Sequence, residues 1–412
     1  MKTAKKHLWN GPAPLKKRAL LRGACAARVA PMKKTASSRR PGREVRIGVV
    51  GVGIIGLAHA DRVARTPRAR LAALCSRNPA KASLAAERGC AFFTDHRELL
   101  RSGTCDAILV ATPHYDHVPI GIDALDAGVH VLLEKPVAVD LAGAQRLAAA
   151  AARRRGLVAA VMFQMRTDPR FVRLRDLLLR GRLGTLQRVT WILTDWFRPD
   201  AYYASAPWRG TWAGEGGGVL VNQCPHQLDL LGWLFGPPER VQAVCGFGRR
   251  HAIEVEDEVT AVLEYPGGCT GTFITATGES PGTNRLEVAG TRGRAVLEGS
   301  SLTVTTNATP SDEYCRSGSD LFGRPAAHVA GSTVEPAAAP HEAVIRNFVD
   351  AILGGLPPVA PLADGVRQVE LANAMLFSAV RGRPVSLPLD AKAFGRCHRR
   401  LVLSKGRGKR PR

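Results

Sequence analysis

Residues 48–56 read GVVGVGIIG, and this stretch decides the fold. Gly51, Gly53 and Gly56 have the spacing G-x-G-x-x-G. The β-branched run VRIGVV at 45–50 precedes them and is typical of a buried parallel strand. A helical pattern, LAHADRVARTP, follows and ends at Pro67. The glycines therefore lie at a predicted strand-to-helix turn, the context in which this spacing binds a dinucleotide.

Each glycine has a physical reason at such a turn. Gly51 permits the tight turn, Gly53 lets the backbone approach a pyrophosphate, and Gly56 lets helix and strand pack closely. Ile54 and Ile55 then begin the helix, whose N-terminus attracts phosphate. We predict that this turn binds NAD or NADP.

The second predicted strand, ARLAALCS at 69–76, leaves the choice between these two cofactors open. It ends without the acidic residue that would bind the ribose 2′-hydroxyl of NAD. Ser76 and Arg77 stand there instead, and both suit the 2′-phosphate of NADP. Arg77 can equally point into solvent, so NAD is not excluded.

Three further strand-like segments, at 90–95, 106–113 and 130–136, alternate with helical patterns. Such alternation predicts a doubly wound parallel sheet. Ligands of these sheets lie beyond the carboxyl ends of the strands. The candidate cofactor-binding residues at those ends are Thr112, Pro113, His117, Glu134 and Lys135.

The charge is concentrated at the two ends of the chain. The 412 residues carry a net charge of +23, and 45% of them are hydrophobic. Residues 1–43 hold 13 Lys or Arg and residues 391–412 hold 9, without any acid. The part between is therefore nearly neutral, and we predict basic tails over 1–43 and 390–412 around two domains. Weak contact with nucleic acid through the tails is the alternative use of this charge.

The nine cysteines are scattered and form no C-x-x-C pair. This predicts free thiols in a reducing compartment, a cytoplasmic location and no metal site. An Arg-rich organellar transit peptide and a translation start at Met32 remain alternatives for the N-terminal segment. We expect no membrane span, because no run of 18 apolar residues occurs.

Five motifs occur in a specific order along the chain: GVGIIG, ATPHYDH, LLEKP, FQMRTDPRF and GEGGGVLVNQCPHQLDLLGWLFG. In these motifs the sequence resembles the Gfo/Idh/MocA oxidoreductases. The resemblance implies a Rossmann NAD(P)-binding domain at 44–160. It also implies an α/β domain at 161–389 with a large, open, mostly antiparallel sheet. That second domain would bind substrate and form a dimer or tetramer.

The segments between 161 and 389 agree with such a domain. Strand-like runs occur at 188–196, 240–248, 258–265, 269–278, 284–290 and 294–299, and two amphipathic helices follow at 341–355 and 362–380. Residues 316–340 are predicted to be a loose loop.

Three residues are candidates for the chemistry. In the family, the lysine that matches Lys135 lies beside the nicotinamide and the reacting hydroxyl, and burial there would lower its pKa. The histidine that matches His226 handles the hydroxyl proton. Asn222, four residues earlier, replaces the Asp of inositol dehydrogenase-like members, so it can orient a substrate but cannot act as a carboxylate base. Asn222, His226 and Asp229 follow one another at spacings of four and three, so along a helix they can share one face.

The substrate contacts are expected from two motifs that carry polar and aromatic groups. Aromatic faces take the C–H surface of a sugar ring, and polar groups take its hydroxyls. Beside Asn222 and His226, the candidates are Arg166, Asp168 and Trp208, with Tyr203, Arg209 and Trp212 near the pocket mouth.

The sequence therefore predicts an NAD(P)-dependent oxidoreductase that acts on a hydroxyl or carbonyl carbon of a sugar, cyclitol or related molecule. The resemblance leaves two alternatives open. One is a cofactor-retaining glycosidase, and the other is a nucleotide-binding regulator without turnover.

Overall fold

The first sheet begins with the run that precedes the glycines. Six parallel strands lie in the order β3-β2-β1-β4-β5-β6, as a doubly wound sheet requires. Their bounds are β1 (Val45–Val50), β2 (Ala69–Cys75), β3 (Ala91–Phe93), β4 (Ala107–Val110), β5 (His130–Leu133) and β6 (Ala159–Val161). The predicted parallel sheet is confirmed, with β6 as a strand that the sequence analysis did not identify.

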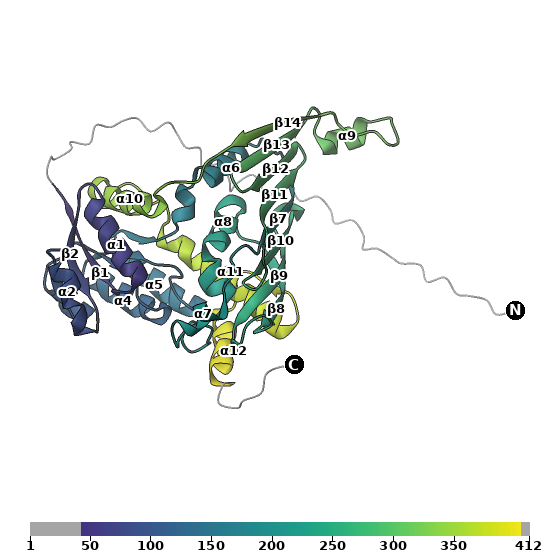
Figure 1. Ribbon diagram of the computed structural model, residues 1–412. Coiled ribbons are helices and arrows are strands. Elements are labelled where there is room, and N and C mark those ends of the chain that lie inside the picture. The colour runs from purple at the N-terminus through teal and green to yellow at the C-terminus, as the bar shows by residue number, and fades with distance from the viewer. Residues whose placement is uncertain (1–42, 405–412) are drawn as a thin grey trace. The chain divides into compact units, whose positions relative to one another are not determined.

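Helices connect these strands and cover both faces of the sheet, so the apolar strands are buried (Figure 1). They are α1 (Ile54–Arg65), α2 (Ala82–Ala86), α3 (His96–Arg101), α4 (His114–Asp126) and α5 (Leu141–Arg153), with the short 3-10 turn η1 (Pro79–Lys81). The computed structural model describes residues 43–404, so the predicted tail over 1–43 lies almost entirely outside the described residues.

The second sheet has nine strands in the order β14-β13-β12-β11-β7-β10-β9-β8-β15. Every neighbouring pair is antiparallel except β7 and β10. The bounds are β7 (Leu186–Leu193), β8 (Arg240–Phe247), β9 (Glu256–Glu264), β10 (Thr270–Ala276), β11 (Asn284–Gly290), β12 (Gly293–Glu298), β13 (Ser301–Asn307), β14 (Ala327–Thr333) and β15 (Val385–Ser386). The predicted open, mostly antiparallel sheet is confirmed.

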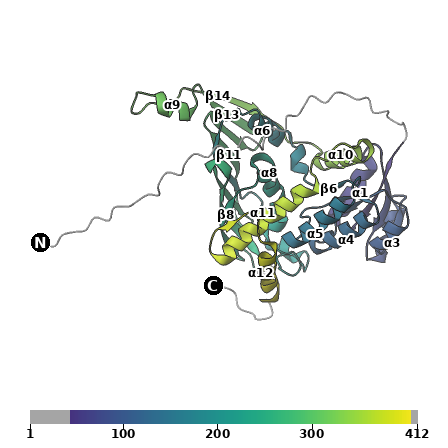
Figure 2. The same ribbon diagram turned by 180° about the vertical axis from the view of Figure 1, so that it is seen from behind.

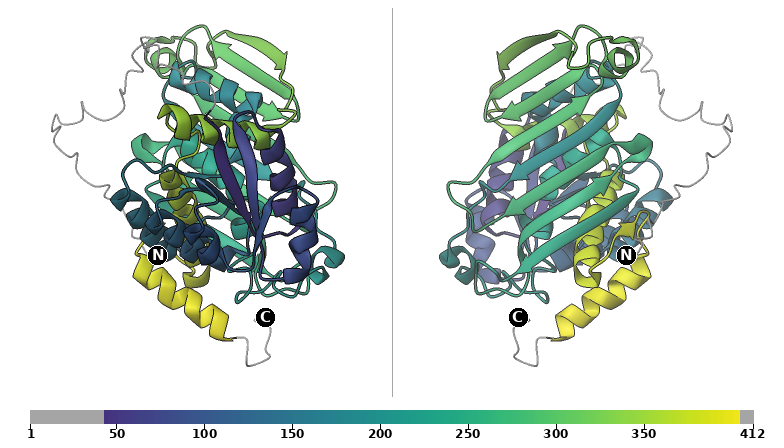
Figure 3. Two further views of the ribbon diagram at one scale, coloured as in Figure 1. Left: turned by 90° about the vertical axis from the view of Figure 1, so that its left-hand side faces the viewer. Right: turned by 90° about the vertical axis from the view of Figure 1, so that its right-hand side faces the viewer.

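One face of this sheet packs on helices, and the opposite face carries none (Figure 3, right). The packed face meets α6 (Pro169–Leu179), α8 (Pro225–Phe235) and α11 (Leu362–Arg381) around the buried ring of Trp191. On the uncovered face, Val244 and Val262 are 65% and 46% exposed. Strand β9 alternates buried and exposed residues, as expected for a sheet with one face in contact with a core.

Two predicted irregular segments are instead ordered. Residues 316–340 were predicted to be a loose loop, but β14 lies within them and pairs with β13. Residues 391–412 were predicted to be a basic tail, but α12 (Ala391–Leu403) occupies most of that segment. Its Phe394 and His398, four residues apart, are buried against the protein, so one apolar face folds the helix despite its many cations.

After the second sheet the chain returns to the first. Helix α10 (Pro340–Gly354) packs Ile345 and Phe348 into the core beside β1 and α1 (Figures 1 and 2). Helix α11 contacts both sheets. Because residues 42–412 cluster as one unit, a domain boundary between 160 and 161 stays a prediction.

The remaining short elements lie in connections between the sheets and helices. They are η2 (Gln164–Thr167), α7 (Asp200–Ala204), the π-helical turn η3 (Val219–Gln223), η4 (Pro266–Gly268) and α9 (Ser311–Ser317). Among the helices of residues 43–404, none is long and apolar enough to cross a membrane.

Candidate active site

A cavity of about 1010 Å³ lies at the carboxyl ends of β1, β2, β4 and β5, where a doubly wound sheet binds its ligand. Residues from η3, α7 and α8 complete its wall. The predicted residues that line it are Gly51, Gly53, Ile54, Ile55, Ser76, Arg77, Thr112, Pro113, His117, Glu134, Lys135, Trp208, Asn222 and His226. Gly56, Arg166 and Asp168 are absent from its lining.

The glycine turn fits a pyrophosphate. Gly51 has φ +99°, and a Cβ there would lie 2.6 Å from the backbone of Ala111. A Cβ on Gly56 would overlap the carbonyl oxygen of Gly51, so this glycine serves the packing of helix against strand and not the cavity wall. Gly53 has nothing within 4 Å of its Cβ position, so its backbone is open to a ligand.

The helix that follows the turn suits the same ligand. The first turn of α1 contains no acidic side chain, so its free N–H groups and positive dipole end face the cavity without competition. Ile54 is 94% exposed at this point. An apolar side chain exposed in a cavity is expected where a bound cofactor covers it.

The end of the cavity beyond β2 carries a mixture of charges. Arg77 lies there, with an exposed side chain, and its Nη2 is 3.3 Å from Asp116 Oδ2. Ser76 accepts a hydrogen bond from the backbone of Asn78. Lys81 and Arg97 also line this end. The cations Arg77, Lys81 and Arg97 therefore line this end of the cavity together with the acids Asp95 and Asp116.

Lys135 directly follows the buried strand β5 and an acidic residue. Its Nζ donates a 2.7 Å hydrogen bond to the backbone oxygen of Asn222. Burial lowers the pKa of Lys135, while the nearby charges of Glu134 and Glu215 oppose that shift. A lysine of lowered pKa exchanges a proton more readily near neutral pH than an ordinary lysine.

The backbone around Lys135 is held by two neighbours. Burial alone would raise the pKa of Glu134, but its 2.6 Å bond to His59 and the surrounding positive charges lower it to about 2. The other oxygen of Glu134 accepts the backbone N–H of Lys135 at 3.1 Å. His117 faces the carbonyl oxygens of Thr112 at 2.8 Å and Pro136 at 2.7 Å, which joins the ends of β4 and β5.

Asn222 lies on the turn η3, with both amide hydrogens engaged. Its Nδ2 donates to the carboxylate of Glu215 and, at 3.2 Å, to the hydroxyl of Tyr202. The second oxygen of Glu215 accepts the backbone N–H of Gly210 at 2.6 Å, and burial raises the pKa of Glu215. This arrangement leaves the amide oxygen of Asn222 available to accept a hydrogen bond from a ligand.

His226 stands in the first turn of α8 and lines the same cavity. Its Nε2 is 3.1 Å from Nε2 of Gln164, and its Nδ1 is buried without a partner among the described residues. Burial and the charge of Lys135 lower its pKa to about 3, so the ring is neutral at physiological pH. An unpaired buried nitrogen in a cavity is expected where a ligand supplies the partner.

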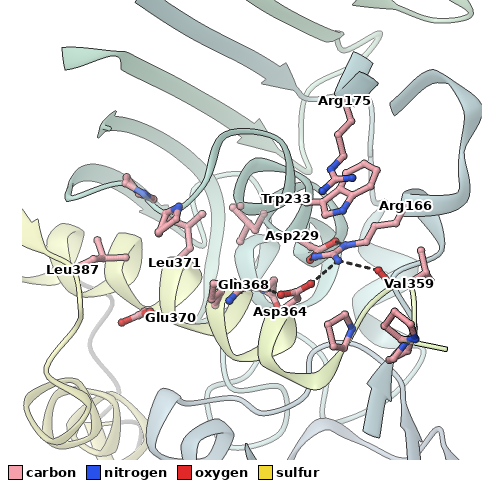
Figure 4. A pocket seen from close by; sticks show the side chains of 18 residues that line it. Arg166, Arg175, Asp229, Trp233, Val359, Asp364, Gln368, Glu370, Leu371 and Leu387 are labelled. Carbon is pink, nitrogen blue, oxygen red and sulfur yellow. Dashed lines mark hydrogen bonds and ion pairs between the residues drawn. The ribbon is translucent and has the colours of Figure 1, made fainter. Parts of the chain in front are cut away.

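Arg166, Asp168 and Asp229 do not line this cavity, although Arg166 and Asp168 are predicted substrate contacts. Arg166 donates to Asp229 at 2.6 and 2.7 Å and to Asp364 at 2.5 Å, as Figure 4 shows. Asp168 caps α6 through the backbone N–H of Arg170. Asp229 and Asp364 line, together with Arg166, a separate cavity of about 590 Å³. Asp229 therefore does not share the face of Asn222 and His226.

The predicted aromatic and polar residues between 203 and 212 also fall into two groups, one that lines the large cavity and one that does not. Trp208 and Arg209 line the large cavity, whereas Tyr203 bonds Thr277 at 3.0 Å and Trp212 packs on His398. Among the lining residues that were not predicted are Gln164, Trp196, Tyr202 and His341. Gln164 and Tyr202 adjoin predicted motifs, so proximity in sequence was an available signal. His341 comes from α10, and no local sequence pattern indicates that it lines the cavity.

Comparison with known families identifies both halves of the chain. The model of an oxidoreductase family with an NAD-binding Rossmann fold matches residues 45–163. The model of the GFO/IDH/MocA C-terminal domain matches residues 171–296.

Individual relatives have the same character. The chain is 31% identical to bovine trans-1,2-dihydrobenzene-1,2-diol dehydrogenase over 61% of its own length and 74% of that protein. It is 29% identical to inositol 2-dehydrogenase of Corynebacterium glutamicum, over 55% of this chain and 61% of that one. Neither relative favours the glycosidase or the regulator alternative.

A solved structure with the same fold contains the predicted type of cofactor. The WlbA dehydrogenase from Bordetella pertussis, in complex with NADH and UDP-GlcNAcA, is 28% identical to this chain. The match has a TM-score of 0.71 and covers 84% of this chain and all of that one.

Proposed function

Because the chain belongs to the Gfo/Idh/MocA family of NAD(P)-binding oxidoreductases, we propose that it oxidises or reduces a CH–OH carbon of a sugar, cyclitol or diol. Relatives named for an inositol and for a dihydrodiol support this substrate class. The nicotinamide, when bound, accepts or supplies the hydride. The residues of this chain bind and orient the two reactants and move one proton.

The glycine turn and the N-terminus of α1 hold the pyrophosphate in this proposal. Ser76 and Arg77 face the ribose, and Thr112, Pro113, His117 and Glu134 form the wall toward the nicotinamide. In the oxidation direction, Lys135 takes the hydroxyl proton as the carbinol carbon loses its hydride. Asn222 accepts a hydrogen bond through its amide oxygen, and His226 donates or accepts through its unpartnered Nδ1.

The observation that carries this assignment is the environment of Lys135. Its ammonium group is partly buried, bonds a carbonyl oxygen and forms no ion pair within the described residues. It lies in one cavity with the glycine turn and with His226. That combination suits a lysine that gives and takes a proton better than one that stabilises the fold.

The test separates binding from chemistry. NADH and NADPH are titrated by fluorescence, and a panel of polyols and sugars is then screened for cofactor reduction. We expect Lys135→Met to lower kcat by roughly 10²–10⁴-fold and to leave the cofactor Kd within a few-fold of wild type. Folded protein that binds neither nucleotide, or a Lys135→Met variant with normal kcat, would overturn the assignment.

Oligomeric state and location belong to the same proposal. The uncovered face of the second sheet, with Val244 and Val262 exposed, supports a homo-oligomer formed through it. Sedimentation of wild type and of Val244→Glu tests this, and a monomeric wild type counts against it.

The eight described cysteines are free, which supports a reducing, cytoplasmic location that cell fractionation can test. The tails proposed for nucleic-acid contact lie mostly outside the described residues.

A further inference from the structure

Arg209 is a cation of the large cavity that is not in direct contact with an acid among the described residues. It lines the cavity together with Lys135 and His226. Its Nη1 donates to the hydroxyl of Tyr202, and its Nε is buried without a partner among the described residues. No carboxylate of residues 43–404 forms an ion pair with it. A buried, unpaired donor of this kind is costly unless a ligand completes it.

The guanidinium is fixed in place by aromatic rings. Its central carbon lies 4.2 Å from the ring centroid of Tyr202 and 4.5 Å from that of Trp208. Stacking of this type leaves the edge of the guanidinium free to donate hydrogen bonds in its plane. Because the side chain is already ordered, a ligand that binds it loses little additional conformational entropy.

The acids around this end of the cavity are occupied elsewhere. Glu215 is the acid whose charge acts on Arg209, but its two oxygens bond Asn222 and the backbone of Gly210. The acids of the lining are also engaged. Asp95 caps α3, Asp116 pairs with Arg77, and Glu134 bonds His59. Lys135 bonds a carbonyl oxygen and, like Arg209, forms no ion pair within residues 43–404, although the charge of Glu215 acts on both.

The neighbouring histidines do not change this balance. Burial lowers the pKa of His114 and of His226 to about 3, and that of His341 to about 4. These rings are neutral at physiological pH and supply hydrogen bonds without charge. The positive charge at this end therefore comes from the lining residues Lys135 and Arg209 and from Arg198, whose guanidinium lies 5.1 Å from the ring centroid of Tyr202 and whose charge acts on Lys135.

We propose that the substrate carries an anionic group, a carboxylate or a phosphate, close to the carbon that is oxidised, and that Arg209 binds this group. The inference rests on the proposed function and narrows its substrate to sugar acids or sugar phosphates. A carboxylate suits the planar edge of one guanidinium, whereas a phosphate would draw more evenly on Arg209 and Lys135.

The first experiment measures binding without any need for turnover. The wild-type protein, alone and saturated with NADH, is titrated by calorimetry with three matched ligands: D-glucuronate, D-glucose 6-phosphate and D-glucose. We expect at least one anion to bind 10-fold or more tightly than glucose. In Arg209→Gln that ratio should fall roughly 10- to 100-fold, the effect of one lost charge-assisted hydrogen bond. Arg209→Lys should retain part of it.

The second experiment repeats the comparison under turnover with oxidised cofactor. We expect the ratio of kcat/KM for acid over neutral sugar to fall in Arg209→Gln, with the change mainly in KM. Arg180→Gln is the control, because Arg180 forms an exposed pair with Asp176 on α6, away from the cavity, and the substitution removes the same charge. It should leave the ratio unchanged, and urea midpoints establish that each variant is folded.

The outcomes separate this inference from the proposed function. Cofactor binding and sugar oxidation that ignore the anionic group, or an unchanged ratio in Arg209→Gln, refute the anionic substrate and leave the oxidoreductase intact. Absence of cofactor binding refutes the proposed function, whereas anion binding that depends on Arg209 still supports the site. A preference for glucuronate over glucose 6-phosphate assigns the carboxylate, and the reverse preference assigns the phosphate.

Discussion

We predict that Arg166 stabilises the fold and does not bind substrate. Replacement of Arg166 by Met tests this prediction. Its guanidinium makes three hydrogen bonds to Asp229 and Asp364 and one of 3.0 Å to the carbonyl of Val359, with the three charged side chains almost fully buried. Met fills similar space without charge. Asp364 retains Arg367 as a partner, so the main effect falls on Asp229.

The loss of unfolding free energy in Arg166→Met is set mainly by the carboxyl of Asp229. Removal of one partner from a buried ion pair costs about 3–5 kcal/mol of unfolding free energy. Burial already raises the pKa of Asp229 from 3.8 to about 6, although Arg166 opposes the shift. Without Arg166 the folded-state pKa rises further. A carboxyl with a raised folded-state pKa loses stability as pH rises, by about 1.4 kcal/mol per unit between its unfolded and folded values.

Wild type and variant therefore differ in a defined pH window. Both lose stability equally between pH 3.8 and about 6, and above that only the variant continues to lose it. The gap between them should widen by about 1.4 kcal/mol from pH 6 to pH 7. Urea unfolding at both pH values measures this.

Arg180→Met is the control for this experiment. Arg180 forms an exposed pair with Asp176 at 2.7 Å, and its removal should cost less than about 0.5 kcal/mol. A loss below about 1 kcal/mol in Arg166→Met, or a gap that does not change with pH, would refute the buried network. Normal stability with lost substrate binding would return Arg166 to the active site.

Three further predictions concern the large cavity. Gly56→Ala should abolish NADH binding and lower stability, because its Cβ would overlap the carbonyl oxygen of Gly51; Gly395→Ala in α12, with open space around it and no positive φ, is the control, and normal NADH affinity in Gly56→Ala would contradict the turn geometry. Arg77→Ala should weaken NADPH about 10-fold and NADH little, as measured by fluorescence titration, and equal effects on both cofactors would place Arg77 in solvent. The rate of substrate oxidation should rise with pH through an apparent pKa below 10.5, since burial lowers the pKa of Lys135 and its neutral form accepts the proton; a profile that persists in Lys135→Met would assign the titration to another group.

Local patterns were sufficient for the first sheet and for the residues at its strand ends. A β-branched strand, a glycine turn and a helix have short-range signals, and parallel strands necessarily place their carboxyl ends together. For this reason the turn at Gly51, Thr112 and Lys135 could be placed together, and the structure has all three in the lining of one cavity.

Other residues depend on contacts that no local pattern encodes. Arg166 and Asp168 have the residue types of a sugar site, but burial beside Asp229 and Asp364 turned the first into part of an ion network. His341 enters the cavity only because α10 returns to the first sheet. The many cations of residues 391–403 led to the prediction of a tail, although these residues form a helix with one apolar face. A charge count takes no account of the helical spacing of the apolar residues.

The return of α10 to the first sheet has a consequence for synthesis of the chain. The six strands of that sheet leave the ribosome long before Ile345 and Phe348, which cover part of its core. About 190 residues separate β6 from these side chains, or roughly 10–40 s of translation. During that interval the nascent sheet exposes an apolar face that chaperones would bind. A stop codon placed after residue 163, beyond the end of β6, should therefore yield an aggregating fragment and not a free nucleotide-binding domain.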